Sequence, residues 1–189
     1  MFTERTTYME LTSAVKERRS VRKYEARPVP HEVIEEIIEA ARYAPSWKNS
    51  QIVRYVLVES KEVKDKLATG DYCYGFTYNA AALSNAPQVL ILTYKRNRSG
   101  FDKDGSFSTP KGDFWEAFDC GLAAQTFCLL AHERGIGTVI QGYFDDAKLA
   151  ELLELPEDMG VGAVIPMGYI GEENKAPKRK EVSELLSYK

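Results

Sequence analysis

The chain has 189 residues, of which 44% are hydrophobic and 28% are charged, and its net charge is −3. This size suits one sizeable core and is short for two independent domains, so we predict a single domain over residues 1–189. The negative charge argues against nucleic acid as the main partner. No apolar run has signal-peptide or membrane-spanning length, so we expect a cytoplasmic protein that does not associate with membranes.

Cysteine and histidine are too sparse for several large enzyme classes. The three cysteines, Cys73, Cys120 and Cys128, show no CxxC spacing, which indicates buried free thiols in a reducing compartment. The two histidines, His31 and His132, both fall within helical patterns. The sequence therefore predicts neither a metal site nor a histidine-based hydrolytic triad.

Apolar residues in the first half of the chain repeat at helical spacing in three segments and gather in two short runs. We predict helices at residues 11–20, 31–44 and 61–68, and strands at residues 52–58 and 88–94. The second strand, QVLILTY, does not alternate with polar residues and should lie in the centre of the sheet. The segment 70–87, rich in tyrosine and alanine, is left unassigned.

The second half opens with a polar stretch at residues 95–112, for which we predict a long loop or lid. A mostly apolar helix should follow at residues 114–134, and its wide apolar surface places it centrally or at a subunit interface. A helix at residues 145–155, a third strand at 161–171 and a basic tail that becomes helical complete the pattern. This alternation favours a three-layer α+β or α/β domain.

A first basic cluster follows the first predicted helix. Arg18, Arg19, Ser20 and Arg22 place three guanidinium groups and a hydroxyl within five residues, a combination that suits a phosphate dianion. Arginines at a helix end also complement the helix dipole, and the cluster taken alone favours that structural role.

A second basic cluster, Lys178, Arg179 and Lys180, lies far away in the sequence and by itself is typical of a solvated tail. Only a fold that brings the two clusters together favours a phosphate site. Neither a Walker A sequence nor a GxGxxG motif after a strand is present, so nucleotide binding by those mechanisms is unsupported.

Two further segments lie between predicted elements. APSWKNSQ, at residues 44–51, holds Pro45, Ser46 and Asn49, which either converge on a ligand or complete a turn. GIGTVIQGYF, at residues 135–144, holds Gln141 and Gly142, whose main-chain amides either face a ring edge or follow a helix cap.

Taken in order, RRSVRKY, APSWKNSQ, GIGTVIQGYF, and MGYIG with KAPKRKEVSELL resemble the FMN-dependent nitroreductases. The resemblance extends from Val15 to the C-terminus, and the ordered set is more specific than any one segment. It implies an α+β three-layer fold with a central mixed or antiparallel sheet flanked by helices. It also implies an intertwined homodimer with FMN at the subunit interface.

The resemblance assigns three groups of residues to the cofactor. The phosphate, ribityl chain and pyrimidine edge would be held by Arg18, Arg19, Ser20, Arg22, Arg179 and Lys178. The partner subunit would contribute Pro45, Ser46 and Asn49. The flavin ring would lie beside Asn79 and accept hydrogen bonds near N5 and O4 from the main chain at Gln141 and Gly142.

The resemblance also implies an oxidoreductase in which FMN carries the chemistry, so no catalytic acid or nucleophile is expected. NADH or NADPH would reduce the flavin and leave before a nitroaromatic, quinone or enone takes its place, which predicts ping-pong kinetics. Two alternatives stay open, a dehalogenase-like flavoenzyme of the same fold and a flavin-binding storage or redox-sensing protein without turnover.

Aromatic residues are concentrated in two places. One group lies in the unassigned segment, at Tyr72, Tyr74, Phe76 and Tyr78, and the other in or next to the predicted lid, at Phe101, Phe107 and Trp115. These rings either line one apolar slot for a flat acceptor or pack in the core and at an interface.

Overall fold

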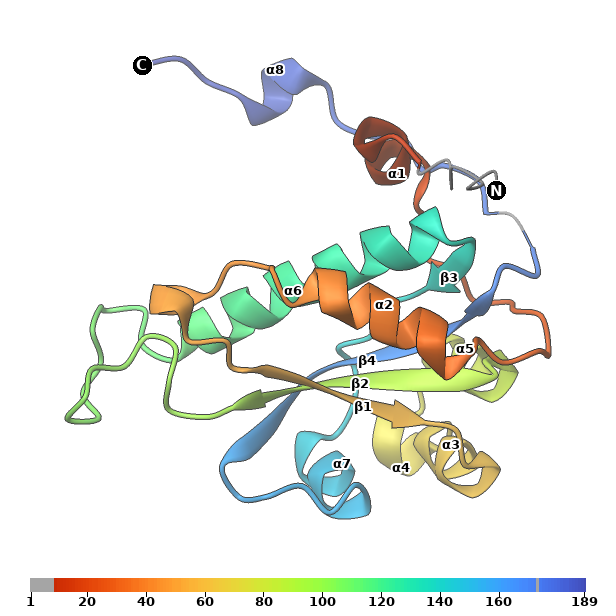
Figure 1. Cartoon of the computed structure of the whole chain (residues 1–189), viewed down its shortest axis with the longest axis horizontal. Coiled ribbons are helices and arrows are strands. Elements are labelled where there is room, and N and C mark those ends of the chain that lie inside the picture. Colours follow the sequence, from red (N-terminus) through yellow and green to blue (C-terminus); the bar gives the residue numbers. More distant parts are fainter. Residues whose placement is uncertain (1–8, 173) are drawn as a thin grey trace, which may run out of the picture.

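The computed structural model describes residues 9–172 and 174–189, and its centre is a four-stranded sheet covered by helices on both faces (Figure 1). The strands are β1 (Val53–Val58), β2 (Gln88–Lys95), β3 (Ile136–Thr138) and β4 (Met159–Tyr169). Their order in the sheet is β1-β2-β4-β3, and all three pairings are antiparallel. The predicted three-layer α+β fold is confirmed, and its sheet is antiparallel.

The helices divide between the two faces and the ends of the chain. One face is covered by α2 (His31–Ala41) and α6 (Phe114–Glu133). The other carries α3 (Lys61–Leu67), α4 (Gly70–Cys73), α5 (Thr77–Asn85) and α7 (Asp146–Leu152). Two short helices, α1 (Leu11–Glu17) and α8 (Val182–Leu185), stand out from the body on one side (Figure 1).

Strand β2 explains why the sheet needs helices on both faces. Successive side chains of a strand point to opposite faces. Leu90 and Leu92 enter the core formed with α2 and α6, whereas Val89 and Ile91 enter the core on the other face. All four side chains are at most 1% exposed. The central position that the sequence predicts for this strand is therefore confirmed.

Several boundaries differ from the expectations. Helix α2 ends at Ala41 rather than Ala44, because its last residues tighten into bonds such as Ala44 N–H to the Ala41 carbonyl, at 3.0 Å. The unassigned segment 70–87 forms α4 and α5.

The sequence does not reveal strand β3. This strand contains Gly137, where an added Cβ would lie 2.7 Å from Val21. A glycine is therefore required where the segment after α1 passes over β3.

Within residues 9–172 and 174–189, no helix is long and apolar enough to span a bilayer. The same residues contain no group of three or more His, Cys, Asp or Glu side chains that could hold a metal ion. The expectation that the N-terminus holds no signal peptide concerns a stretch that includes residues 1–8. These eight residues lie outside the described residues.

We predict that none of the three thiols reacts in the folded protein. Cys73, Cys120 and Cys128 are free and buried, and burial raises the pKa of Cys120 to about 12. At pH 8 that pKa leaves about one thiolate in 10⁴. A disulfide-exchange reagent at pH 8 should give no rapid colour with native protein and three equivalents after unfolding. Rapid stoichiometric labelling of the native protein would contradict this account of the core.

Candidate functional site

The two basic clusters of the sequence line one cavity. Its volume is about 340 Å³, and it is lined by Arg18, Arg19, Ser20, Arg22, Asn174, Lys175, Pro177 and Arg179. Five of these residues are cationic and none is acidic. Lys178 is exposed and is not among the lining residues, although its neighbour Arg179 is. Segments about 160 residues apart thus create a strongly positive pocket suited to an anion.

The main chain fixes the first wall of this cavity against the sheet. Helix α1 ends at Glu17, and Arg18 adopts an extended conformation. Ser20 then forms a parallel bridge with Thr138, the last residue of β3, in which Val21 N–H donates to the Thr138 carbonyl at 2.9 Å. The arginines therefore project from an extended segment beside the sheet edge.

Tyr24 holds the far end of the same segment. Its hydroxyl lies 2.6 Å from the Val21 carbonyl and 3.0 Å from the Pro166 carbonyl, and its main-chain N–H donates to Asn85 Oδ1 at 2.8 Å. Burial raises the pKa of this tyrosine, so the hydroxyl stays protonated and can donate. The segment is tied in this way both to β4 and to α5.

The three arginines of the first cluster differ in their hydrogen bonding. Arg19 Nη1 donates to the Lys16 and Arg18 carbonyls at 2.6 and 2.8 Å, which is the structural role at a helix end that the cluster alone favours. Arg22 Nη1 donates to the Ser20 carbonyl at 3.2 Å. Arg18 Nε, by contrast, is buried and has no acceptor among the described residues. A buried donor of this kind calls for a bound anion or water.

A second group of predicted residues lies near the bridge between Ser20 and Thr138. Gln141 N–H donates to the Val164 carbonyl at 2.9 Å, so this amide is engaged within the sheet. The Gln141 side chain donates to the Asn79 carbonyl at 3.4 Å, and Asn79 Nδ2 donates to the Tyr143 carbonyl at 3.3 Å. Between them, the Gly142 N–H has no acceptor among the described residues, and a Cβ added at Gly142 would meet nothing within 4 Å. Of the two main-chain donors predicted here, only that of Gly142 is available.

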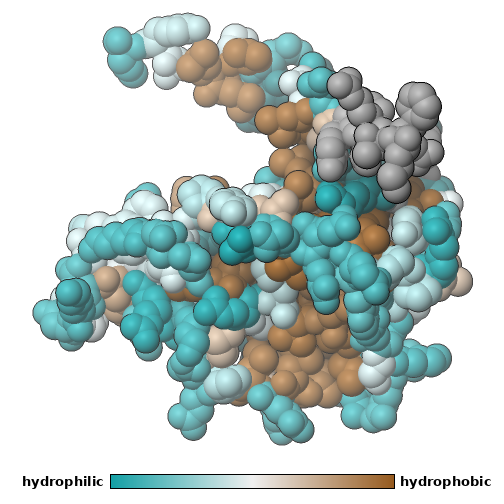
Figure 2. Space-filling view, in the orientation of Figure 1, coloured by the Kyte–Doolittle hydropathy of each residue, from teal (hydrophilic) through white to brown (hydrophobic). Residues whose placement is uncertain are grey.

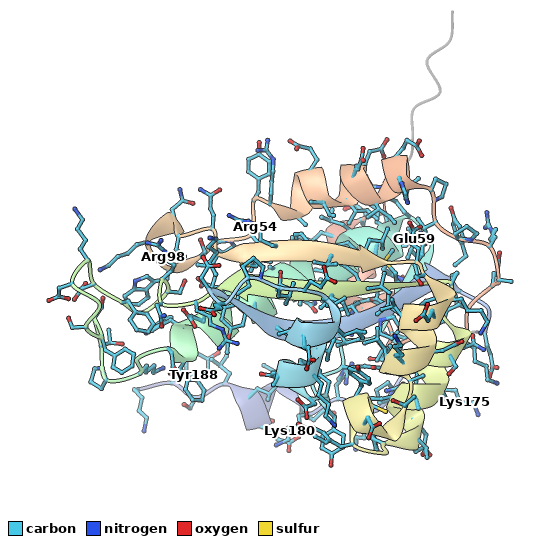
Figure 3. The ribbon with its side chains drawn as sticks, turned by 90° about the horizontal axis from the view of Figure 1, so that it is seen from below. Arg54, Glu59, Arg98, Lys175, Lys180 and Tyr188 are labelled. Carbon is cyan, nitrogen blue, oxygen red and sulfur yellow. The ribbon has the colours of Figure 1, made fainter. Side chains whose placement is uncertain are left out.

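The third predicted group lies at the opposite end of the molecule. Pro45 and Ser46 line a cavity of about 140 Å³ that also contains Asp119, and Asn49 belongs to the short helix η1 (Trp47–Asn49). In Figure 3, Arg54 and Arg98 mark this end of the molecule and Lys175 marks the end with the basic cavity. One chain does not bring the three groups together.

Helix α6 gives a scale for this separation. Asp119, near its first turn, binds Trp47 N–H at 3.0 Å, whereas His132 lies near its last turn. Burial lowers the pKa of His132, and the charges of Arg18 and Arg19 act in the same direction against that of Glu17. Asp119 and His132 are thirteen residues apart in this helix. At a rise of 1.5 Å per residue, about 20 Å separates them along the helix axis.

The aromatic side chains form three clusters rather than one slot. Tyr143 contacts Tyr74 and Phe76 edge to face, with ring centroids 5.2 and 5.6 Å apart, and Phe76 also contacts Tyr78. A second cluster pairs Phe101 with Phe107, and a third joins Trp115 to Trp47 and Phe118. Of the two alternatives for these rings, a single chain does not join them into one slot. The first cluster is exposed and adjoins Gly142.

Some residues of the site escape sequence reasoning. Asn174 and Lys175 line the basic cavity next to the predicted cluster. Their position at or next to the start of the basic segment KAPKRK could have indicated this from the sequence. Asp119 and Tyr24 act through hydrogen bonds to segments distant in the sequence, for which a single sequence carries no signal.

We predict that Tyr24→Phe lowers the free energy of unfolding by about 1–2 kcal/mol, because two buried carbonyls lose the single hydroxyl proton that they share. Urea unfolding followed by circular dichroism measures the change. Tyr169→Phe is a suitable control, since its ring lies under Arg27 and no hydrogen bond of its hydroxyl occurs among the described residues. Equal midpoints for Tyr24→Phe and wild type would show that this hydroxyl does not hold the segment.

Comparison with known proteins agrees with the resemblance noted in the sequence. The profile of the Nitroreductase family matches residues 15–71 and 75–169. A protein of Methanothermobacter thermautotrophicus, provisionally named an NADH dehydrogenase/NAD(P)H nitroreductase, is 32% identical over 168 residues, covering 87% of this chain and 79% of that protein. The Bacillus subtilis protein named FMN reductase (NAD(P)H) is 31% identical over 157 residues, covering 78% of this chain and 61% of that protein.

Solved structures agree as well. A crystal structure from Bacteroides thetaiotaomicron, under the same provisional name as the Methanothermobacter protein, matches with a TM-score of 0.77 at 26% identity. The match covers 96% of this chain and 98% of that one. The chain therefore belongs to the nitroreductase family.

Proposed function

We propose that this protein is an FMN-dependent oxidoreductase with NADH or NADPH as its electron donor. The observation that carries the proposal is the basic cavity, whose lining among the described residues has five cationic side chains and no acidic one. Such a cavity suits a phosphate dianion, and FMN ends in one. The Bacillus subtilis relative is named for FMN and NAD(P)H, which supports the same cofactor and donor here.

In this proposal the FMN phosphate binds where Arg18 has an unmet buried donor. The other residues around the phosphate, ribityl chain and pyrimidine edge are Arg19, Ser20, Arg22 and Arg179. Lys178, which is exposed beside Arg179, is a secondary candidate at the rim. The cationic groups repel one another without a ligand, so an anion between them removes that repulsion as well as accepting hydrogen bonds.

The flavin ring would extend from this cavity toward Asn79, Gln141 and Gly142. When bound, FMN supplies transfer of a hydride equivalent from NAD(P)H to the acceptor. The Gly142 N–H, which has no acceptor among the described residues, is suited to donate to the ring edge, while Gln141 keeps the chain in place through its bonds to Val164. Donors fixed in advance at an edge where negative charge develops favour the reduced state.

We propose that Pro45, Ser46 and Asn49 reach the flavin from a second copy of the chain. Within one chain about 20 Å of helix α6 separates this group from the arginines. The tail that follows the basic cavity also requires cover, because Val182 and Leu185 are 71% and 70% exposed. Figure 2 shows a hydrophobic surface on the projecting arm that carries α8. An intertwined homodimer accounts for both features.

We further propose that the acceptor is small, flat and electron-poor, such as a nitroaromatic, quinone or enone. Tyr74, Phe76, Tyr78 and Tyr143 expose between 45% and 68% of their surface beside Gly142. Exposed rings of this kind offer stacking surfaces to a flat ligand. Donor and acceptor would use the same face of the flavin, which leads to ping-pong kinetics.

We predict that Arg18→Ala raises the dissociation constant of FMN by about 10- to 100-fold, because hydrogen bonds to charged groups contribute about 1.5–3 kcal/mol. Quenching of flavin fluorescence on titration into protein freed of cofactor measures the constant. Lys16→Ala is the matched control, since it removes an exposed cation two residues away that does not line the cavity. Equal affinities for Arg18→Ala and wild type would place the phosphate elsewhere.

We predict that NADH or NADPH rapidly bleaches the flavin absorbance of the FMN-loaded protein under anaerobic conditions. Adding a quinone or nitroaromatic should then restore the band without further nucleotide. Bound flavin that neither nucleotide reduces would instead favour storage or redox sensing, and a protein that binds no FMN would overturn the proposed function.

A further inference from the structure

Asp119 is a buried carboxylate in a mostly apolar helix, with 2% of its surface exposed. Its oxygens lie 3.0 and 3.1 Å from Trp47 N, 2.5 Å from Ser99 Oγ and 3.3 Å from Ser50 Oγ. No Lys or Arg among the described residues forms an ion pair with it. Because a buried charge needs such compensation, these hydrogen bonds are what keep the carboxylate inside.

The loop that Asp119 contacts has a strained backbone. Lys48, Asn49 and Gln51 have φ angles of 46°, 56° and 47°, in the left-handed region that non-glycine residues rarely adopt. Each such residue costs about 1 kcal/mol or more, and the conformation persists only where its surroundings enforce it. Trp47 and Ser50, the two residues of this loop that donate to Asp119, stand on either side of Lys48 and Asn49. The carboxylate therefore clamps both ends of the strained pair.

The same network ties the loop to residues 95–112. Ser50 Oγ and Ser99 Oγ are 2.8 Å apart, and Lys48 Nζ lies 3.1 Å from Asp102 Oδ1. The side chains of Lys48, Asn49 and Gln51 remain exposed, so the clamp holds the loop from within while its outer surface stays free. A loop ordered in this way is already shaped for a ligand, and binding need not order it.

We propose that Asp119 is a positioning residue that sets the conformation of residues 46–51 for their entry into the flavin site of the partner subunit. The proposal rests on the proposed function for the identity of that site. The clamp itself can be tested without the cofactor.

Glu116 provides a matched comparison one turn earlier on the same helix. It is also buried, at 6% exposure, and its Oε1 accepts from Arg98 N–H at 3.1 Å. It holds residues 95–112 but has no hydrogen bond to residues 46–51 among the described residues. Asp119→Asn and Glu116→Gln both replace a buried carboxylate by the isosteric amide, and only the first acts on the clamp.

The first experiment measures amide hydrogen exchange of residues 47–51 in the cofactor-free protein, together with the rate of tryptic cleavage after Lys48. For Asp119→Asn we expect both rates to rise about tenfold, and for Glu116→Gln less than about twofold. Ser50→Ala removes only the hydroxyl at one end of the clamp and should raise the exchange and cleavage rates about threefold. This variant replaces Asp119→Asn in the test if Asp119→Asn does not fold. Unchanged rates in the variants that fold would overturn the clamp.

The second experiment measures the dissociation constant of FMN and the thermal midpoint of the same variants. The proposal requires Asp119→Asn to weaken FMN binding about tenfold, and Glu116→Gln less than about twofold at a comparable loss of thermal stability. A loosened loop with undiminished FMN affinity would show that Asp119 does not position the site. If wild type itself binds no FMN, the proposed function and the positioning role both fail, and the exchange data alone decide whether Asp119 sets the loop.

Discussion

Helix α6 runs across one face of the sheet and separates the two groups of polar residues that the proposed flavin site combines. Its 20 residues form a rigid rod packed on β2 and β4, so these ends cannot approach one another. The basic cavity lies toward the last turn, and residues 46–51 lie against the first. Under the proposed function a complete site therefore needs a second chain, and the exposed apolar arm after the cavity offers a surface to hold it.

Electrostatics suggest how the cofactor would contribute to stability. Among the residues that the structure describes, five cationic side chains and no carboxylate line one cavity, an arrangement that costs free energy in the absence of a ligand. A bound dianion would turn this repulsion into attraction, so FMN should stabilise the native state in proportion to its affinity. Residues 46–51 show the opposite arrangement, since the buried carboxyl group of Asp119 accepts hydrogen bonds from three nearby donors.

The sequence was informative where a local pattern controls the structure. The unbroken apolar run of β2 predicts its central position, and the spacing of apolar residues predicts α2 and α6 to within a few residues. Strand β3 was missed because three residues, one of them Gly137, are too few for a periodicity. The nine residues of α5 lack a clear apolar face, which left segment 70–87 unassigned.

Some site residues were likewise predictable from a local sequence pattern and others were not. The arginine cluster was recognisable from composition, but only the fold reveals that Arg179 lines the cavity while its neighbour Lys178 does not. An acidic residue in a helix is normally expected on the solvent side. The sequence therefore did not predict that residues 46–51 and 95–112 cover Asp119. Long-range hydrogen bonds decide both cases, and a single sequence does not encode them locally.

The central claim is that each site combines the basic cavity of one subunit with residues 46–51 of the other. The most direct test mixes two impaired homodimers, Arg18→Ala and the double variant Ser46→Ala/Asn49→Ala, and measures NAD(P)H oxidation by the purified hybrid. In a hybrid, one site carries both defects and the other carries neither, so the account predicts close to half of the wild-type activity per dimer. A hybrid no more active than its parents would contradict the shared site, because it would place the arginines and the loop in sites built from a single chain.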